Sequence, residues 1–223
     1  MKAVRTRRLA ATSLIAVLAL TGCARNPDVA VRLGELSVSN ADIQAMAAPV
    51  VAQLESDGYT NVTGAVEQSI VKLEAVREVA RRYAQEKGVT VPPPDFTGVD
   101  ANEPYVRLQA EAWSYLNALQ AAAAPRRPTE DEMQRIYDRF IELAGEGAAT
   151  YEQLGADLLE MPDYHRWLSV RDELTAAADR YGLTVNPLYQ PLELELFTLA
   201  QGQIVMVTLP LGEQGTGAAA PAN

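Results

Sequence analysis

Few side chains in this sequence are of the kinds that perform catalysis, and they are scattered along the chain. The 223 residues include one cysteine, Cys23, and one histidine, His165. His165 stands between Tyr164 and Arg166 in a segment with helical periodicity. A histidine without a second catalytic or metal-binding companion is best interpreted as an ordinary residue on a helix surface. We therefore assign His165 no role in catalysis.

Two acidic runs could imitate the carboxylate pair of a glycosidase. The first run, residues 130–132, follows Thr129 at a predicted helix start, where negative charge favours the helix dipole. In the second run, Glu193 and Glu195 alternate with leucines, as in a strand with one face in water. The sequence also contains no GxSxG, HExxH, P-loop or EF-hand motif. We predict no enzyme activity, no cofactor and no metal site; an enzyme with a site assembled from distant residues stays open as an alternative.

The N-terminal segment has the pattern of a secretory signal peptide. Four basic residues precede an apolar run of about 12 residues, too short for a membrane span, which needs roughly 20. The run ends in Leu20-Thr21-Gly22-Cys23, which resembles the lipobox of bacterial lipoproteins. The resemblance implies that signal peptidase recognises Leu20, Thr21 and Gly22 and that Cys23 carries the lipid. We expect residues 1–22 to be a signal peptide and the protein to be lipid-anchored on the extracytoplasmic face of the bacterial membrane.

The charge balance excludes one class of partner. Removal of residues 1–22 would take away four of the 19 basic residues and none of the 29 acidic ones, leaving a net charge of −14. Such a surface does not favour nucleic acid, because basic side chains supply the affinity for phosphate. Anionic lipid would also repel it, so membrane attachment depends on the lipid at Cys23. We expect residues 23–28 to form a short tether, with Ala24–Pro27 reaching roughly 15 Å when extended.

Apolar residues at spacings of three and four predict a chain of helices. Ser39 with Asp42, and Thr129 with Glu132, are typical of capping boxes at helix starts. The predicted helices cover about 39–57, 63–87, 103–124, 129–141, 151–160 and 162–181. The 25 residues from Thr63 would form a helix roughly 37 Å long, which predicts an elongated body.

Alternating apolar residues predict two β-hairpins, one at each end of the helical body. The first covers about 29–38 and the second about 192–209. An isolated hairpin is only marginally stable, so we predict that the two hairpins pair into one small sheet. The expected fold is mainly α with a small β element: one elongated helical domain over residues 29–210, closed by its terminal strands. Residues 211–223 have little to bury and are predicted to be a disordered tail.

The order of these segments resembles a known family. An N-terminal hairpin, the helix start at residues 39–43, and the long helix ending in residues 84–91 (AQEKGVTV) are similar to SurA-type N-terminal domains. Residues 128–132 (PTEDE) are similar to the helix that precedes the parvulin isomerase domain in that family. Residues 181–187 (YGLTVNP) are similar to the C-terminal segment of lipoproteins that carry this domain alone. The resemblance covers most of residues 28–210 and implies a peptide-binding chaperone domain.

The chain departs from the family at the isomerase domain. The interval between Phe140 and Tyr181 is too short for one and has a helical pattern, and a parvulin site usually contains a pair of histidines. We therefore expect no peptidyl-prolyl isomerase activity. The aromatic residues Trp113, Tyr115, Trp167 and Tyr181 either line a peptide groove or belong to the core.

These observations lead to two hypotheses about function. The first is a membrane-anchored lipoprotein that binds unfolded or translocating polypeptide in the manner of a chaperone, with an acidic surface that favours cationic segments. The second is a structural or adaptor lipoprotein that binds one folded partner of the cell envelope. An open apolar cradle would favour the first hypothesis, and a deep polar pocket with convergent ionisable groups would favour an enzyme.

Overall fold

The computed structural model describes residues 28–145, 149–199 and 204–211. The predicted signal peptide, the lipidation site at Cys23 with Leu20, Thr21 and Gly22, and the predicted tail after Leu211 lie outside the described residues. The helices are α1 (Asn40–Ser56), α2 (Thr63–Lys87), α3 (Pro104–Ala122), α4 (Glu130–Ala144), α5 (Tyr151–Leu159) and α6 (Pro162–Arg180). The strands are β1 (Val29–Leu33), β2 (Leu36–Ser39), β3 (Leu183–Val185), β4 (Leu192–Leu199) and β5 (Ile204–Leu211), with the short 3₁₀ helix η1 (Pro187–Tyr189) before β4. The mainly helical fold with a small β element is therefore confirmed.

Local capping explains where several helices begin and end. The predicted capping boxes are both present: Ser39 with Asp42 starts α1, and Thr129 with Glu132 starts α4. A third box, Thr150 with Gln153, starts α5. Helix α2 ends at Gly88, whose φ of 65° lies in the left-handed region that glycine adopts without a Cβ clash.

The strands form two separate antiparallel sheets. The first sheet has the order β2-β1-β3, so β1 lies in the middle, with Leu33 opposite Leu183 and Val31 opposite Val185. The second sheet consists of β4 and β5 alone. Our prediction that the two terminal hairpins pair with each other is wrong. The N-terminal hairpin pairs instead with β3, which follows α6 directly and places Leu183 and Val185 in the core.

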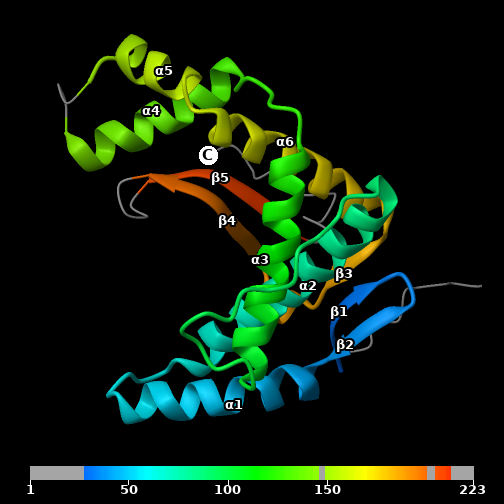
Figure 1. Ribbon diagram of the computed structural model, residues 1–223. Helices are drawn as coiled ribbons and strands as arrows, with labels where there is room; N and C mark the ends of the chain where they lie inside the picture. The colour runs from blue at the N-terminus through cyan, green and yellow to red at the C-terminus, as the bar shows by residue number, and fades with distance from the viewer. Residues whose placement is uncertain (1–27, 146–148, 200–203, 212–223) are drawn as a thin grey trace, which may run out of the picture.

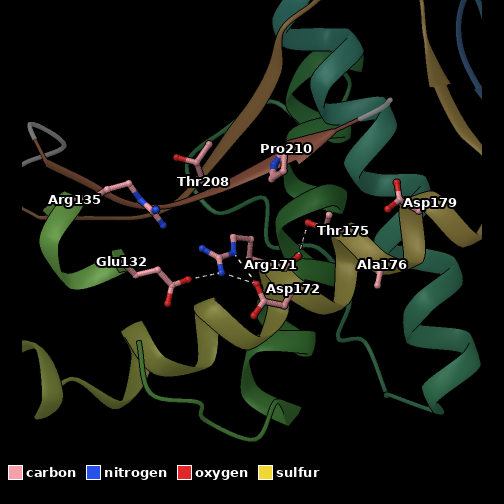
Figure 2. A pocket seen from close by; sticks show the side chains of 9 residues that line it. All are labelled: Glu132, Arg135, Arg171, Asp172, Thr175, Ala176, Asp179, Thr208 and Pro210. Carbon is pink, nitrogen blue, oxygen red and sulfur yellow. Dashed lines mark hydrogen bonds and ion pairs between the residues drawn. The ribbon is translucent and has the colours of Figure 1, made fainter. Parts of the chain in front are cut away.

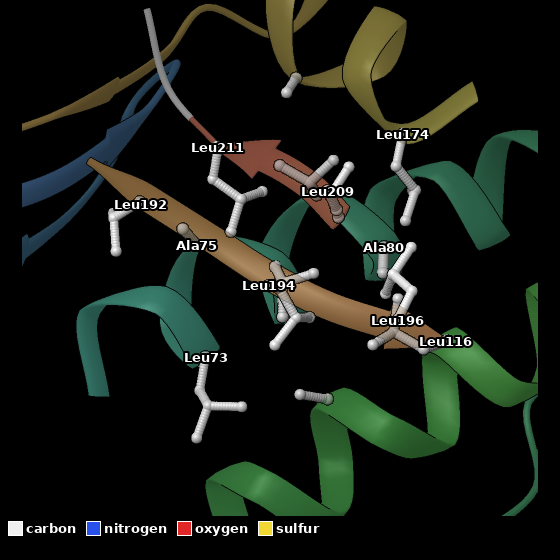
Figure 3. Packing of buried hydrophobic residues seen from close by; sticks show 14 of the residues in the cluster. Leu73, Ala75, Ala80, Leu116, Leu174, Leu192, Leu194, Leu196, Leu209 and Leu211 are labelled. Atoms are coloured by element: carbon white, nitrogen blue, oxygen red, sulfur yellow. The ribbon is translucent and has the colours of Figure 1, made fainter. Parts of the chain in front are cut away.

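The β4–β5 sheet needs no third strand because helices cover it. Its leucines at 192, 194, 196, 209 and 211 are buried, and Figure 3 shows them among apolar side chains of α2, α3 and α6, including Leu73, Leu116 and Leu174. Burial of this kind contributes about 25 cal/mol for each Å² of apolar surface. The helices thus provide the stability that we had expected from pairing with the first hairpin.

Both predicted limits of the folded domain shift by one residue. Leu211, which we assigned to the tail, is the last residue of β5 and is buried. Asp28, which we assigned to the tether, accepts a hydrogen bond at its backbone oxygen from the amide of Asn40 (2.8 Å). The folded domain therefore includes Asp28 at its N-terminal end and Leu211 at its C-terminal end.

The molecule is elongated, with α1 at one end and the α4–α5 pair at the other (Figure 1). Helices α2, α3 and α6 pack between these ends, and the β4–β5 sheet lies beneath α4 and α6. Within the described ranges, no helix combines the length and the apolar character that crossing a membrane requires.

Candidate functional site

Side chains of α4, α6 and β5 line a groove on the surface of the protein. It consists of two adjoining hollows of about 550 Å³ and 290 Å³. Both hollows are lined by Glu132 and Arg135 of α4, Arg171 of α6 and Thr208 of β5, so they form one continuous feature. We refer to it as the groove. Figure 2 shows its larger part, with α4 on one side, α6 below and the strand behind.

Helical and strand periodicity place the lining side chains. Residues 132, 135 and 136 lie on one face of α4, and residues 171, 172, 175, 176 and 179 lie along one face of α6. From β5 come Val205, Met206, Thr208 and Pro210. The groove therefore combines charged side chains of α4 and α6 with apolar side chains from all three elements.

Glu132 holds α4 onto the rest of the protein. Its carboxylate accepts hydrogen bonds from both terminal nitrogens of Arg126 (2.9 and 2.8 Å), from Arg171 (2.6 Å) and from the Thr129 amide (2.8 Å). The residue is only 8% exposed. The Arg126 hydrogen bonds are the main cause of a Glu132 pKa well below its usual range. Glu132 thus belongs to the capping box of α4 and also forms a buried ion pair with Arg171 of α6.

A polar connection also fixes the segment between α3 and α4. The Arg126 amide donates to the His165 backbone oxygen (3.2 Å), and the Ser169 hydroxyl donates to the Ala124 oxygen (2.7 Å). Because this segment covers the first turns of α6, His165 is buried (9% exposed) rather than on the surface, so our interpretation of it was wrong. Its Nε2 has no hydrogen-bond partner among the described residues.

The four aromatic residues that we considered for a groove lie elsewhere. Trp113 and Trp167 pack edge to face between α3 and α6, with centroids 6.3 Å apart. Tyr181 donates a hydrogen bond to Glu86 and lies under Arg180. Tyr115 is partly buried against the core. None of them lines the groove described here, so the core interpretation holds for the tryptophans and the groove is built from other residues.

Sequence reasoning identified Glu132 only as a helix-capping residue and missed most of the other residues that line the groove. Arg135, Arg171, Asp179 and Thr208 carried no motif, because they come from three elements that are distant in sequence. The spacing of four between Arg171, Thr175 and Asp179 was the only available signal. It predicts that the three side chains lie on one face of a helix, but not which other element packs opposite that face.

A smaller hollow of about 210 Å³ lies between α1, α2 and α3. Its Arg77 is already paired with Glu74 (2.5 Å) and approaches Glu111 (3.5 Å). Burial raises the pKa of Glu74, which is 5% exposed. Since these charges satisfy one another, we interpret this cluster as part of the helix packing. Among the described residues, no group of histidine, cysteine or acidic side chains is placed to hold a metal ion.

Tyr164 provides a test of the packing beneath the groove. Its ring is fully buried and stacks on Phe197, and burial raises its pKa to about 12. The hydroxyl has no partner among the described residues. Removing a buried, unsatisfied hydroxyl is nearly neutral or stabilising, so we expect Tyr164→Phe to change the free energy of unfolding by about 0 to +1 kcal/mol. Urea denaturation measures this; a loss of more than 1 kcal/mol would show that the hydroxyl is hydrogen-bonded in solution.

The protein is a helical domain in which β1, near the start of the described chain, pairs with β3, which follows α6. The open groove between α4, α6 and β5 has both polar and apolar lining residues. No known protein family, curated protein or solved structure matches this chain.

Proposed function

We propose that this protein is a lipid-anchored extracytoplasmic lipoprotein that binds unfolded or translocating polypeptide in the manner of a chaperone. The observation that carries the proposal is the groove, which is open to solvent and lined by both apolar and charged side chains. Extended polypeptide presents the same mixture along its length. The proposal includes no peptidyl-prolyl isomerase activity.

Two further features support this proposal. The lipobox at Leu20–Cys23 places the domain beside a membrane across which chains emerge unfolded, if Cys23 is lipidated as we propose. The order of hairpin, long helix and C-terminal strand is the one expected from the resemblance to SurA-type N-terminal domains. In this proposal the partners are non-native polypeptides and the membrane lipid at Cys23, with no nucleic acid.

The test uses residues 24–223, which lack the lipidated cysteine. We expect this protein to suppress aggregation of a reduced model protein and to bind unfolded peptides at micromolar concentration. Failure in both assays would reject the proposal. Crosslinking to a single stoichiometric folded partner, with indifference to unfolded chains, would instead favour the adaptor function.

A bulky side chain in the groove should separate groove binding from other binding. Ala176 is exposed on α6 and lines the groove. We expect Ala176→Trp to weaken peptide binding at least fivefold, because the indole would occupy the space that the peptide needs. Fluorescence anisotropy with a labelled unfolded peptide measures the dissociation constant.

The matched control is Ala45→Trp, at an exposed position of α1 at the opposite end of the molecule. Both substitutions carry the same helix-propensity cost, so both proteins should fold equally well. Equal peptide affinity in the two variants would place the binding surface outside the groove.

A further inference from the structure

Within its larger hollow, the groove has two charged side chains of opposite sign on opposite sides. Arg135 of α4 lies at one end of this hollow and Asp179 of α6 at the other (Figure 2). Among the described residues, neither side chain has a hydrogen-bond or ion-pair partner, and both are exposed. They are therefore available to a ligand that lies along the groove.

The charges between these ends are already neutralised. Arg171 pairs with Glu132 (2.6 Å) and with Asp172 (2.5 Å), and Asp172 also accepts from Arg126 (2.6 Å). A ligand in the middle of the groove thus meets satisfied ion pairs, Thr175 and Thr208. Its strongest new electrostatic contacts are at the two ends.

The separation of the two ends fits an extended peptide. Arg171 precedes Asp179 by eight residues, so their backbones lie about 12 Å apart along the axis of α6. Arg135 enters the hollow from α4 on the Arg171 side (Figure 2), so the span from Arg135 to Asp179 is of this order. In an extended chain, residues four apart face the same side and lie about 13 Å apart. The ammonium and carboxylate of a free amino acid share one carbon and cannot reach both ends.

We propose that the groove selects extended polypeptide segments that carry an acidic side chain beside Arg135 and a basic side chain about four residues away beside Asp179. This inference rests on the proposed function, because it names the kind of segment that the same groove binds. It also refines the expectation from net charge: the acidic surface alone favours cationic segments, whereas the groove adds a place for one acidic residue.

The experiment measures binding of labelled 11-residue peptides to the full chain in detergent micelles at low salt. The probe peptides contain Glu-x-x-x-Lys, Gln-x-x-x-Lys, Glu-x-x-x-Gln or Gln-x-x-x-Gln, with serine and alanine elsewhere. Exposed charge pairs contribute modestly. We therefore expect each charged residue to tighten binding about threefold and the two together to tighten it about tenfold. The gain should disappear in 1 M salt.

Charge-removing variants of the protein locate the two contacts. Arg135→Gln should abolish the gain from glutamate and leave the gain from lysine, and Asp179→Asn should do the reverse. Both residues are exposed, so both variants should fold, which circular dichroism verifies. The proposal is overturned if either variant weakens all four peptides equally, or if a Glu-Lys dipeptide competes as well as the 11-residue peptide.

The outcomes distinguish this inference from the proposed function. If the uncharged peptide binds in the groove and is sensitive to Ala176→Trp, but charge has no effect, the function stands and the charge pattern is wrong. If none of the peptides binds and unfolded proteins do not bind either, the proposed function itself fails.

Discussion

Replacing Glu132 by alanine is expected to lower the free energy of unfolding by about 3 kcal/mol, since Asp172 alone would then have to compensate the charges of both Arg126 and Arg171. The Arg126 and Arg171 guanidinium groups would face each other without the carboxylate between them. The substitution also removes the hydrogen bond that the Thr129 amide donates to the Glu132 carboxylate, which is one half of the capping box of α4. The Thr129 hydroxyl keeps its bond from the backbone amide of residue 132. For a domain of this size the midpoint of thermal unfolding should fall by roughly 10 °C. Differential scanning calorimetry measures this shift.

The control for this prediction is Glu130→Ala, two residues earlier in the same helical turn. Glu130 is exposed and helps α4 only through the helix dipole, so its removal should cost less than 1 kcal/mol. If Glu130→Ala and Glu132→Ala destabilise the protein equally, the ionic network does not hold α4 in solution.

The same residue predicts a dependence of stability on pH. The pKa of Glu132 is held well below its usual range in the folded protein, mainly by Arg126, and is about 4.3 in an unfolded chain. The stabilisation is therefore complete above about pH 5 and is lost as the pH falls below the unfolded value. We expect Glu132→Gln to be less stable than wild type at pH 6 and to approach it as the pH is lowered. A difference in stability that stays constant from pH 6 to pH 3 would contradict this sign.

The local rules of helix formation were sufficient to predict most of the helices. The capping boxes at Ser39 and Thr129 were visible in the sequence because their partners are only three residues apart. The end of α2 at Gly88 was visible for the same reason. Interactions within one helical turn depend on nothing that lies outside it, so a sequence pattern captures them.

The candidate site was not predictable in the same way. Glu132 was interpreted as a dipole-favouring residue, which is correct but incomplete, because its partner Arg171 lies 39 residues further along the chain. His165 was interpreted as exposed because nothing in its own helix indicates that the segment before α4 covers it. Both errors arise from contacts between elements, and no motif records these contacts.

Strand pairing shows the same limit in the fold itself. Alternating residues identified the hairpins but not their partners, since a strand offers the same hydrogen-bonding groups to any neighbour. The structure gives β1 the partner β3, and Leu33 and Leu183 stand directly opposite each other with both side chains buried. The helices that bury the β4–β5 sheet remove its need for the first hairpin.

This pairing leads to a second large effect. We expect Leu33→Ala to lower the free energy of unfolding by about 3 to 4 kcal/mol, because Leu33 is fully buried on the central strand of its sheet and its truncation leaves a cavity in the core. Leu183→Ala should cost about 2 to 3 kcal/mol. The control is Arg32→Ala, an exposed neighbour in the same strand, which should change stability by less than 0.5 kcal/mol.

The double variant separates β1–β3 pairing from general loss of core packing. Residues that contact each other are non-additive by about 0.5 to 3 kcal/mol, whereas distant residues add within about 0.5 kcal/mol. We therefore expect Leu33→Ala with Leu183→Ala to cost at least 0.5 kcal/mol less than the sum of the single losses, measured by urea denaturation. A parallel cycle of Leu33→Ala with Leu194→Ala of β4 should be additive. Coupling in the second cycle and none in the first would mean that the N-terminal hairpin pairs with the C-terminal one, and the two-sheet arrangement would then be wrong.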